Sequence, residues 1–324
     1  MRPQMSTPTA PGPVVVTGGA GSIGAVLARR LAETGHPVRV VDNLSSGKRE
    51  RLADLEAAGK VEFFVHDLRD PSGLAEMFRG AEAVWHLAAN PNIPAGMEDP
   101  RIDLEHGTLA TAHTLDAARE ARVRRFLFSS SSVVYGFPTV FPTPESYGPL
   151  LPESQYGASK LASEGLISAY CHSFGMRGWI FRFANIAGPG MSHGVIYDFL
   201  RKLQRDPARL EVLGDGRQAK SYLWVDDCVD AMRLAEERAG EAVNVFNLGT
   251  EQQVPVRIIA ERVVRAFGGT ARIEYTGGRR GWVGDIPQQL LSIDRIKSLG
   301  WRPRYDSLTV VDMAIATGRS ELGL

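Results

Sequence analysis

A tyrosine and a lysine stand four positions apart in the segment SQYGASK, residues 154–160, which opens a long stretch of helical periodicity. Tyr156 and Lys160 should therefore lie one turn apart on the same helix face. A free tyrosine titrates at about pH 10 and is a poor base at neutral pH, but a nearby positive charge favours its phenolate form. The pair alone is weak evidence for chemistry, because the same spacing is common in solvated pairs on surface helices.

Four serines, Ser129 to Ser132, follow a short apolar run in FLFSSSSVVYG. Open parallel sheets bind ligands at the carboxyl ends of their strands, so hydroxyl groups at this place are candidates for contact with a substrate. Serines at a strand end can also serve only to satisfy the backbone of a turn.

A glycine-rich turn separates the first apolar run from the first helical stretch, in VVVTGGAGSIGAVLARRL. Gly18, Gly21 and Gly24 permit a tight turn, close approach of a pyrophosphate to the backbone, and close packing of the helix on the sheet. The start of the helix supplies N–H donors to the phosphates. With a strand before it and a helix after it, the turn predicts a dinucleotide site.

An acidic residue ends the second strand, in VRVVDN. Asp42 is placed to accept hydrogen bonds from both ribose hydroxyls of an adenosine and to repel a 2′-phosphate, which favours NAD over NADP. Lys48 and Arg49 follow closely and weaken this preference. Asp67, past the third strand, could meet the adenine or only terminate its strand.

The elements that must position these residues alternate along the chain. From residue 13 to about 188, short β-branched runs are each followed by a longer stretch of helical spacing. That alternation predicts an α/β fold with a Rossmann-type doubly wound parallel sheet. Shorter, mixed elements follow. We therefore expect an NAD-binding domain at 13–188, a smaller mixed α/β substrate-binding lobe at 189–324, some of whose elements could return to the main sheet, and a disordered lead-in at 1–12.

Composition argues against several classes of partner. Lys plus Arg and Asp plus Glu both number 37, and no basic run is dense enough to follow a phosphate backbone, so we expect no nucleic-acid partner. No apolar stretch reaches membrane length, and the N-terminus lacks the apolar region of a signal peptide, so a cytoplasmic protein without membrane contact is expected. Cys171 and Cys228 are far apart in sequence and suggest neither a disulfide nor a metal site.

Seven segments, TGGAGSIG, VVDNLSSG, HDLRD, HLAAN, FSSSSVVYG, YGASK and RFANIAGPG, resemble in order and spacing the extended short-chain dehydrogenase/reductase family of NAD-dependent epimerases and dehydratases. Within it the chain is most similar to the UDP-glucose 4-epimerases, from about residue 13 to the end. The resemblance implies Tyr156 as base and acid, and Lys160 as a ribose ligand that modulates the pKa of the tyrosine. It implies Ser131, four residues before Tyr135, as the hydroxyl that bridges sugar O4 to the phenol.

The resemblance also implies the residues that bind two ligands, NAD and a UDP-sugar, and a homodimer formed through the fourth helix and the Tyr156 helix. For NAD they are Gly18, Gly21, Ser22, Ile23, Gly24, Asp42, Asn43, Ser46, Gly47, Asp67, Leu68, Leu87, Ala88, Ala89, Ser129, Tyr156, Lys160 and Phe183. For the UDP-sugar they are Ser131, Tyr156, Asn185, Gly194, Val195, Lys220, Tyr222, Arg280 and Asp285.

The chain departs from the family pattern at several places. Ser22 replaces the usual phenylalanine of the glycine turn, and Lys220 stands where relatives usually carry an arginine. The run DLEHGT replaces an asparagine-rich run and leaves Gly107 or its neighbours where an asparagine normally stabilises the helix and lines the site. Arg280 and Asp285, expected to grip the nucleotide, are separated by GWVG, whereas relatives often show Arg-x-x-Asp.

Two further positions bear on the reaction. Dehydratases and sugar-acid decarboxylases of this family usually carry an acidic residue where this chain has Ser132, and GPGMSHG lacks the arginine that relatives place against a sugar carboxylate. Both favour a 4-epimerase of the UDP-glucose/UDP-galactose type, which oxidises C4 transiently and returns the hydride to the opposite face. A nucleotide-sugar dehydratase, a uronic-acid 4-epimerase and a non-catalytic NAD sensor stay as alternatives.

Overall fold

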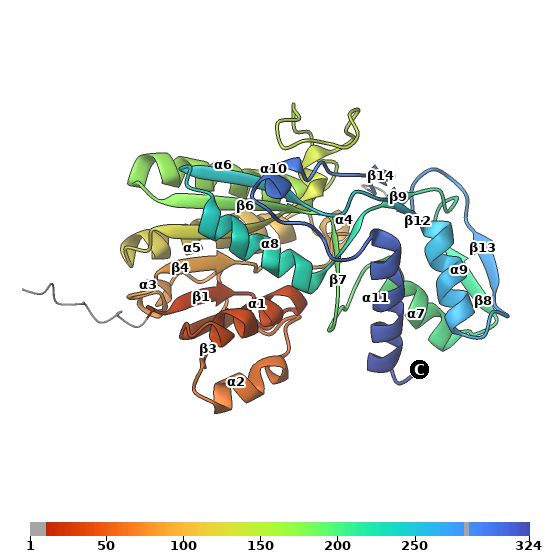
Figure 1. Cartoon of the computed structure of the whole chain (residues 1–324), viewed down its shortest axis with the longest axis horizontal. Coiled ribbons are helices and arrows are strands. Elements are labelled where there is room, and N and C mark those ends of the chain that lie inside the picture. Colours follow the sequence, from red (N-terminus) through yellow and green to blue (C-terminus); the bar gives the residue numbers. More distant parts are fainter. Residues whose placement is uncertain (1–10, 282–284) are drawn as a thin grey trace, which may run out of the picture.

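The computed structural model describes residues 11–281 and 285–324 of the chain (Figure 1). Of the lead-in expected at 1–12, residues 1–10 lie outside the described residues. At its start, the backbone N–H of Gly12 donates to Oε1 of Glu82 at 2.6 Å. This hydrogen bond connects the segment that precedes the first strand to Glu82, the residue that precedes the fourth strand.

Seven parallel strands form the main sheet, in the order β11-β6-β5-β4-β1-β2-β3. The chain builds outward from β1 to β3 and then continues on the other side of β1, so the strand order reverses between β1 and β4. This confirms the predicted Rossmann-type sheet, whose ligands bind at that reversal. The strands are β1 (Val14–Thr17), β2 (Val38–Asp42), β3 (Val61–Val65), β4 (Ala83–His86), β5 (Arg125–Ser131), β6 (Arg177–Phe183) and β11 (Val243–Leu248).

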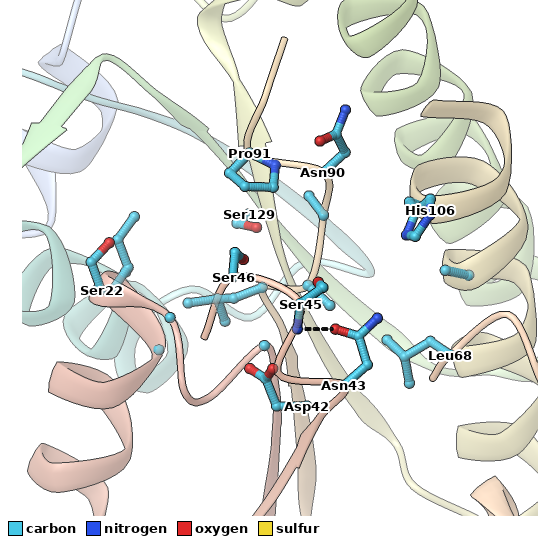
Figure 2. Close-up of a pocket in the computed structure, with 18 of the residues that line it drawn as sticks. Ser22, Asp42, Asn43, Ser45, Ser46, Leu68, Asn90, Pro91, His106 and Ser129 are labelled. Atoms are coloured by element: carbon cyan, nitrogen blue, oxygen red, sulfur yellow. Dashed lines mark hydrogen bonds between the residues drawn. The ribbon is translucent and has the colours of Figure 1, made fainter. Parts of the chain in front are cut away.

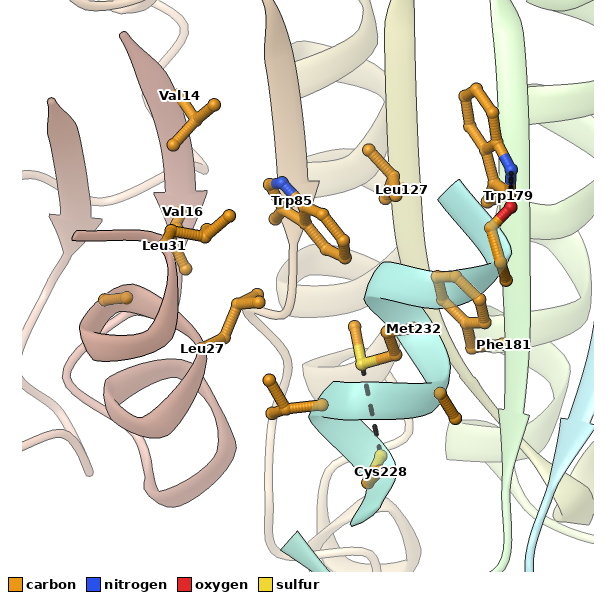
Figure 3. Close-up of a cluster of buried hydrophobic side chains, with 14 of the residues drawn as sticks. Val14, Val16, Leu27, Leu31, Trp85, Leu127, Trp179, Phe181, Cys228 and Met232 are labelled. Carbon is orange, nitrogen blue, oxygen red and sulfur yellow. Dashed lines mark hydrogen bonds between the residues drawn. The ribbon is translucent and has the colours of Figure 1, made fainter. Parts of the chain in front are cut away.

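Helices cover both faces of the sheet, because successive residues of a buried strand point to opposite sides. Val14 and Val16 face one apolar layer, and Val15 faces the other. Figure 3 shows the first layer, in which helices α1 and α8 meet the sheet around Trp85 and Trp179. This layer is covered by α1 (Ser22–Glu33), α2 (Ala53–Ala57) and α8 (Val225–Arg238), and the other by α3 (Leu74–Met77), α5 (Ala110–Glu120) and α6 (Gln155–Phe174).

Short helical segments fill the connections near the carboxyl ends of the strands. They are the 3₁₀-helices η1 (Arg49–Leu52) and η3 (Ser132–Tyr135), the π-helix η2 (Leu104–Leu109) and the single turn α4 (Ala95–Glu98). The π-helix runs directly into α5 and packs against α6. A π-helix is rare and often marks a functional site.

A smaller mixed α/β lobe lies beside the main sheet (Figure 1). Its helices α7 (Val195–Arg205), α9 (Val256–Ala266) and α11 (Ser307–Glu321) pack around an apolar core of their own. Its strands form three small sheets. These pair β7 (Asn185–Ala187) with β10 (Tyr222–Trp224), β8 (Arg209–Val212) with β13 (Arg272–Tyr275), and β9 (Ala219–Lys220) with both β12 (Val254–Pro255) and β14 (Gln288–Gln289).

Some elements beyond residue 189 belong to the main sheet. Strand β11 pairs with β6 and forms one edge of the main sheet, and α8 packs against α1. Helix α10 (Asp294–Ser298) packs against β11, with Ile296 in the same apolar layer as Trp179. The sequence left open whether elements of this region return to the main sheet, and these three do.

Candidate functional site

In the glycine-rich turn between β1 and α1, the backbone packs directly against other backbone atoms, those of Ala88 and those of the turn itself. Gly18 has a φ of +67°, and a Cβ there would lie 2.7 Å from N of Ala88. A Cβ on Gly24 would lie 2.2 Å from the carbonyl oxygen of Gly18. Neither position has room for a side chain. Helix α1 begins at Ser22 behind Gly21, without a side chain that caps its first N–H groups, so these donors face the turn as an anion site.

Asp42 ends β2 beside this turn and is 8% exposed. Its Oδ2 accepts a hydrogen bond from N of Ala20 at 3.0 Å, and its Oδ1 accepts one from N of Leu44 at 2.8 Å. Each carboxylate oxygen keeps a second lone pair for a ligand hydroxyl. Gly47 packs on this carboxylate, because a Cβ there would lie 2.8 Å from Oδ1 of Asp42.

A pocket lies at the carboxyl ends of β1 to β5, where the sheet order reverses. Figure 2 shows Ser22 at the start of α1, Asp42 and Asn43 at the carboxyl end of β2, and Ser129 on β5 around it. Gly47 does not line the pocket. Of the residues predicted to bind the cofactor, those that line it are Gly18, Gly21, Ser22, Ile23, Gly24, Asp42, Asn43, Ser46, Asp67, Leu68, Leu87, Ala88, Ala89, Ser129, Tyr156, Lys160 and Phe183.

The pocket also has lining residues that the sequence did not identify, among them Arg51, His106, Gly190 and His193. Arg51 is the most informative. Its Nη1 donates to O of Ala20 at 2.7 Å, and its Nη2 donates to O of Gly190 at 2.9 Å. It therefore connects the glycine-rich turn to the loop before α7 across the pocket. Only the Gly/Pro punctuation of GPGMSHG signalled that loop.

Tyr156 and Lys160 occupy the first turns of α6, whose start is capped by Ser154, which accepts from N of Gly157 at 3.1 Å. Lys160 is 3% exposed; its Nζ donates to O of Ser129 at 2.6 Å and lies 5.6 Å from the centre of the Tyr156 ring. Lys160 of the predicted pair is therefore hydrogen-bonded to β5, the strand that carries the first three serines.

The electrostatics of the pair follow from burial. Burial lowers the pKa of Lys160 to about 7, opposed by the Asp103 and Glu164 carboxylates. Burial also raises the pKa of the Tyr156 phenol well above its ordinary value, and the Asp103 carboxylate raises it further. Tyr156 is therefore a proton donor in the protein alone, and a positive charge beside the ring is needed to make it a base at neutral pH.

The four serines differ in their partners. Ser129 Oγ donates to O of His86 at 3.3 Å, Ser130 Oγ donates to Oε1 of Glu164 at 2.5 Å, and Ser132 Oγ accepts from Nε2 of Gln289. Ser131 Oγ has only a long contact from N of Val133, 3.4 Å, within the described part of the chain. Its hydroxyl is thus the one most available to a ligand, although Ser131 does not line the pocket.

The predicted substrate residues fall into separate groups. Lys220 on β9 pairs with Asp285, Nζ to Oδ1 at 2.6 Å, and the other oxygen of Asp285 accepts from N of Gly281 at 3.1 Å. Asn185 on β7 donates to Oε1 of Gln289 at 3.2 Å, which places it near Ser132. Strands β9 and β14 thus bring together residues from distant parts of the sequence.

The remaining predicted substrate residues have other contacts. The Arg280 guanidinium lies 4.5 Å from the centre of the Phe137 ring, and Gly194 and Val195 form the start of α7. Tyr222, on β10, is 4% exposed and packs with the apolar core of the lobe, and its contact with the substrate stays a prediction.

The departure at Gly107 has a structural counterpart. Gly107 lies in the π-helix η2, where a Cβ would be 2.5 Å from Oγ and 3.0 Å from Cβ of Ser159. Ser159 lies on α6 between Tyr156 and Lys160, and its Oγ donates to O of Tyr156 at 3.0 Å. Absence of a side chain at Gly107 therefore lets η2 approach the turn that carries the reactive pair.

Other features of the chain give no further support for a functional site. His86 is fully buried between the hydroxyls of Thr17 and Thr111, and burial lowers its pKa to about 3, as suits a neutral core histidine. Among the described residues, no three His, Cys, Asp or Glu side chains are grouped to hold a metal ion. In the same residues, no helix is both long enough and apolar enough to span a bilayer.

Comparison with known proteins places this geometry in a family. The family model described as "NAD dependent epimerase/dehydratase family" matches residues 14–249. The chain belongs to this family. It is an enzyme fold of the extended short-chain dehydrogenase/reductase type, as the sequence motifs indicated.

Individual members of the epimerase/dehydratase family resemble the chain over nearly its whole length. It is 34% identical to the UDP-glucose 4-epimerase of Mycolicibacterium smegmatis over 90% of this chain and 93% of the relative. A crystal structure of a UDP-galactose 4-epimerase is 39% identical, with a TM-score of 0.86 over 96% of this chain and 99% of that one. The UDP-glucose 4-epimerase of Thermus thermophilus in complex with NAD is 31% identical, with a TM-score of 0.84 over 95% and 99%.

Proposed function

We propose that the chain is an NAD-dependent UDP-sugar 4-epimerase that interconverts UDP-glucose and UDP-galactose or a close analogue. The observation that carries the proposal is the placement of Tyr156 and Lys160 on α6 beside the serine segment, where both line the same pocket as the glycine-rich turn. The similarity to UDP-glucose and UDP-galactose 4-epimerases supports the choice of reaction and substrate.

The pocket residues suit NAD. The glycine turn has no room for side chains at Gly18 and Gly24 and presents the free N–H groups of α1 to a pyrophosphate. The carboxylate of Asp42 suits two ribose hydroxyls and opposes a 2′-phosphate. When bound, the nicotinamide would supply a hydride acceptor and donor for the C4 position of the sugar.

The residues of the chain would hold and move the proton. Tyr156 would take the proton from the sugar O4 hydroxyl and later return it. The Ser131 hydroxyl would hydrogen-bond to the same oxygen and so hold it beside the phenol. The Lys160 ammonium, fixed by Ser129 O, would lower the pKa of the phenol as an opposite charge does. Asn185 and the Lys220–Asp285 pair would receive the nucleotide end of the substrate.

The position after Ser131 favours an epimerase over a dehydratase. Ser132 there is bonded to the Gln289 amide, and neither group can act as a carboxylate acid or base. A proton can then be exchanged at O4 by Tyr156 while C5 and C6 stay unchanged. The dehydratase, the uronic-acid epimerase and the NAD sensor are the other outcomes of the test below.

The first experiment incubates the purified protein separately with UDP-galactose, UDP-GlcNAc and UDP-glucuronic acid and follows the sugars by proton NMR. We expect inversion at C4, lost by at least ~10²-fold in Tyr156→Phe because the general base is gone. Tyr170→Phe is the matched control, since this tyrosine lies on the same helix and bonds only to Asp116 among the described residues. Loss of water from the sugar would establish a dehydratase, and no turnover by NAD-loaded protein would contradict the epimerase.

We also propose a homodimer formed through α5 and α6, as the family resemblance implies. Leu104 and Leu109, the first and last residues of η2 directly before α5, expose apolar side chains that such a contact would cover. Light scattering after size exclusion should give twice the mass of the chain, and a mass equal to one chain would contradict the dimer.

A further inference from the structure

A buried pair of opposite charges lies beneath the serine segment. Glu164 on α6 and Arg182 on β6 are 6% and 5% exposed. Arg182 holds both carboxylate oxygens, Nε to Oε1 at 3.0 Å and Nη2 to Oε2 at 2.7 Å. A buried ion pair is a costly way to stabilise a fold, because both charges lose their water, so its geometry calls for another explanation.

Glu164 continues the line of reactive residues on α6. It follows Lys160 by four positions and Tyr156 by eight, so the three side chains lie on one face of the helix. Lys160 Nζ donates to O of Ser129, and Glu164 Oε1 accepts from Oγ of Ser130. Successive residues of β5 are therefore fastened to successive turns of α6.

The same pair also holds the far end of the serine segment. Arg182 Nη1 donates to OH of Tyr135 at 2.9 Å, and that hydroxyl donates to Oδ1 of Asn247 at 2.7 Å. Tyr135 is the last residue of η3, which begins directly after Ser131. Ser131 thus lies between two points, Ser130 and Tyr135, that are both bonded to the Glu164–Arg182 pair.

We propose that Glu164 is a positioning residue of the active site, which through Ser130 and Arg182 holds residues 130–135 so that the Ser131 hydroxyl is presented to the substrate. The role of Ser131 itself rests on the proposed function. Glu164 is buried and is not among the residues that line the pocket, so its effect on the site passes through other residues. It acts by fixing the register of the serine segment against the helix that carries Tyr156 and Lys160.

Two variants loosen the segment in different ways. Ser130→Ala removes one hydroxyl and leaves the ion pair intact, so it should fold normally. Glu164→Leu with Arg182→Met replaces the pair by apolar side chains of similar size, a change that buried ion pairs often tolerate. Thr114→Ala is the matched control, because its hydroxyl is equally buried but bonds to O of Ala110 in α5.

The first readout does not depend on the reaction. Hydrogen exchange of the backbone amides in residues 131–136, measured by mass spectrometry on the full chain, should become at least ~10-fold faster in both test variants and stay unchanged in Thr114→Ala. Unchanged protection in a double variant that still unfolds cooperatively would overturn the proposal.

The second readout uses whichever UDP-sugar the wild type converts. Misplacing a reacting group by about 1 Å costs up to ~10²-fold, so kcat should fall by ~10-fold or more in both test variants with KM nearly unchanged. Retention of kcat within twofold would overturn the assignment to the active site. If the wild type converts no nucleotide sugar, the proposed function fails, while the exchange experiment still decides whether Glu164 holds the segment.

Discussion

At the scale of single residues, burial opposes the positive charge of Lys160 more strongly than the neighbouring carboxylates favour it. Burial lowers its pKa from an ordinary 10.5 to about 7, whereas the unfolded chain keeps the ordinary value. Between these two values the unfolded chain binds the proton and the native protein has released it. Stability therefore rises with pH across this window, and the gain is absent below about pH 7, where both states are protonated.

We expect the free energy of unfolding of the cofactor-free protein to increase between pH 7 and about 10, and the increase to shrink in Lys160→Met. Urea unfolding at a series of pH values measures it. Lys48→Met, at an exposed lysine beside the pocket, should keep the wild-type slope. An identical slope in Lys160→Met and wild type would show that Lys160 titrates normally in the native protein.

At the scale of elements, the contact between the π-helix η2 and α6 depends on Gly107 and Ser159. A side chain at position 107 would press on Ser159, since even a Cβ there would come within 3.0 Å of two Ser159 atoms. The glycine therefore permits the observed contact of η2 with the turn between Tyr156 and Lys160. Sequence showed the departure but not the packing that accompanies it.

Gly107→Ala should destabilise the protein by ~1–3 kcal/mol through overpacking, although alanine is the better helix former. Adding Ser159→Gly restores the space, so the double variant should lose less stability than the two single variants summed. Denaturant unfolding of all four proteins gives the coupling. Additive losses would mean that the two residues do not press on each other, contrary to the observed geometry.

The elements were predictable where local pattern decides them. Alternating apolar and helical spacing specified the parallel sheet, and the glycines specified the turn because only backbone fits there. Arg51 and Gln289 were not predictable, because their partners, Gly190 and Ser132, lie 139 and 157 positions away. The sequence also did not show that Lys220 and Tyr222 lie in different small sheets, because the chain passes from β9 to β10 at Ser221.

At the scale of the whole molecule, Arg51 connects two distant segments across the pocket proposed to bind the cofactor. It bonds to the glycine turn at Ala20 and to the loop before α7 at Gly190. The N–H of Gly190 in turn donates to Oε1 of Glu321, at the end of α11, at 2.7 Å. The loop that carries Ser192 and His193 is thus held over the pocket from both sides.

We expect Arg51→Met to release the cofactor faster, by ~10-fold or more, because two charged hydrogen bonds that keep the loop closed are lost. Displacement of bound NADH, followed by its fluorescence, measures the rate. Arg49→Met is the control, since Arg49 pairs with Glu56 away from the loop. Equal release rates in the two variants would rule out Arg51 as the closing contact.

The core of the lobe is assembled from three stretches of chain, residues 187–222, 254–264 and 310–315. Between them the chain returns to the main sheet, through Leu223 to Leu248 and again through Ile293 to Trp301. No single cut in the chain therefore separates the main sheet and its helices from the lobe proposed to receive the sugar. A chimera that takes its sugar preference from a relative must therefore receive all three of these stretches from that relative. If only the C-terminal third is exchanged, the lobe core is built partly from each protein, and residues that pack together come from different sequences.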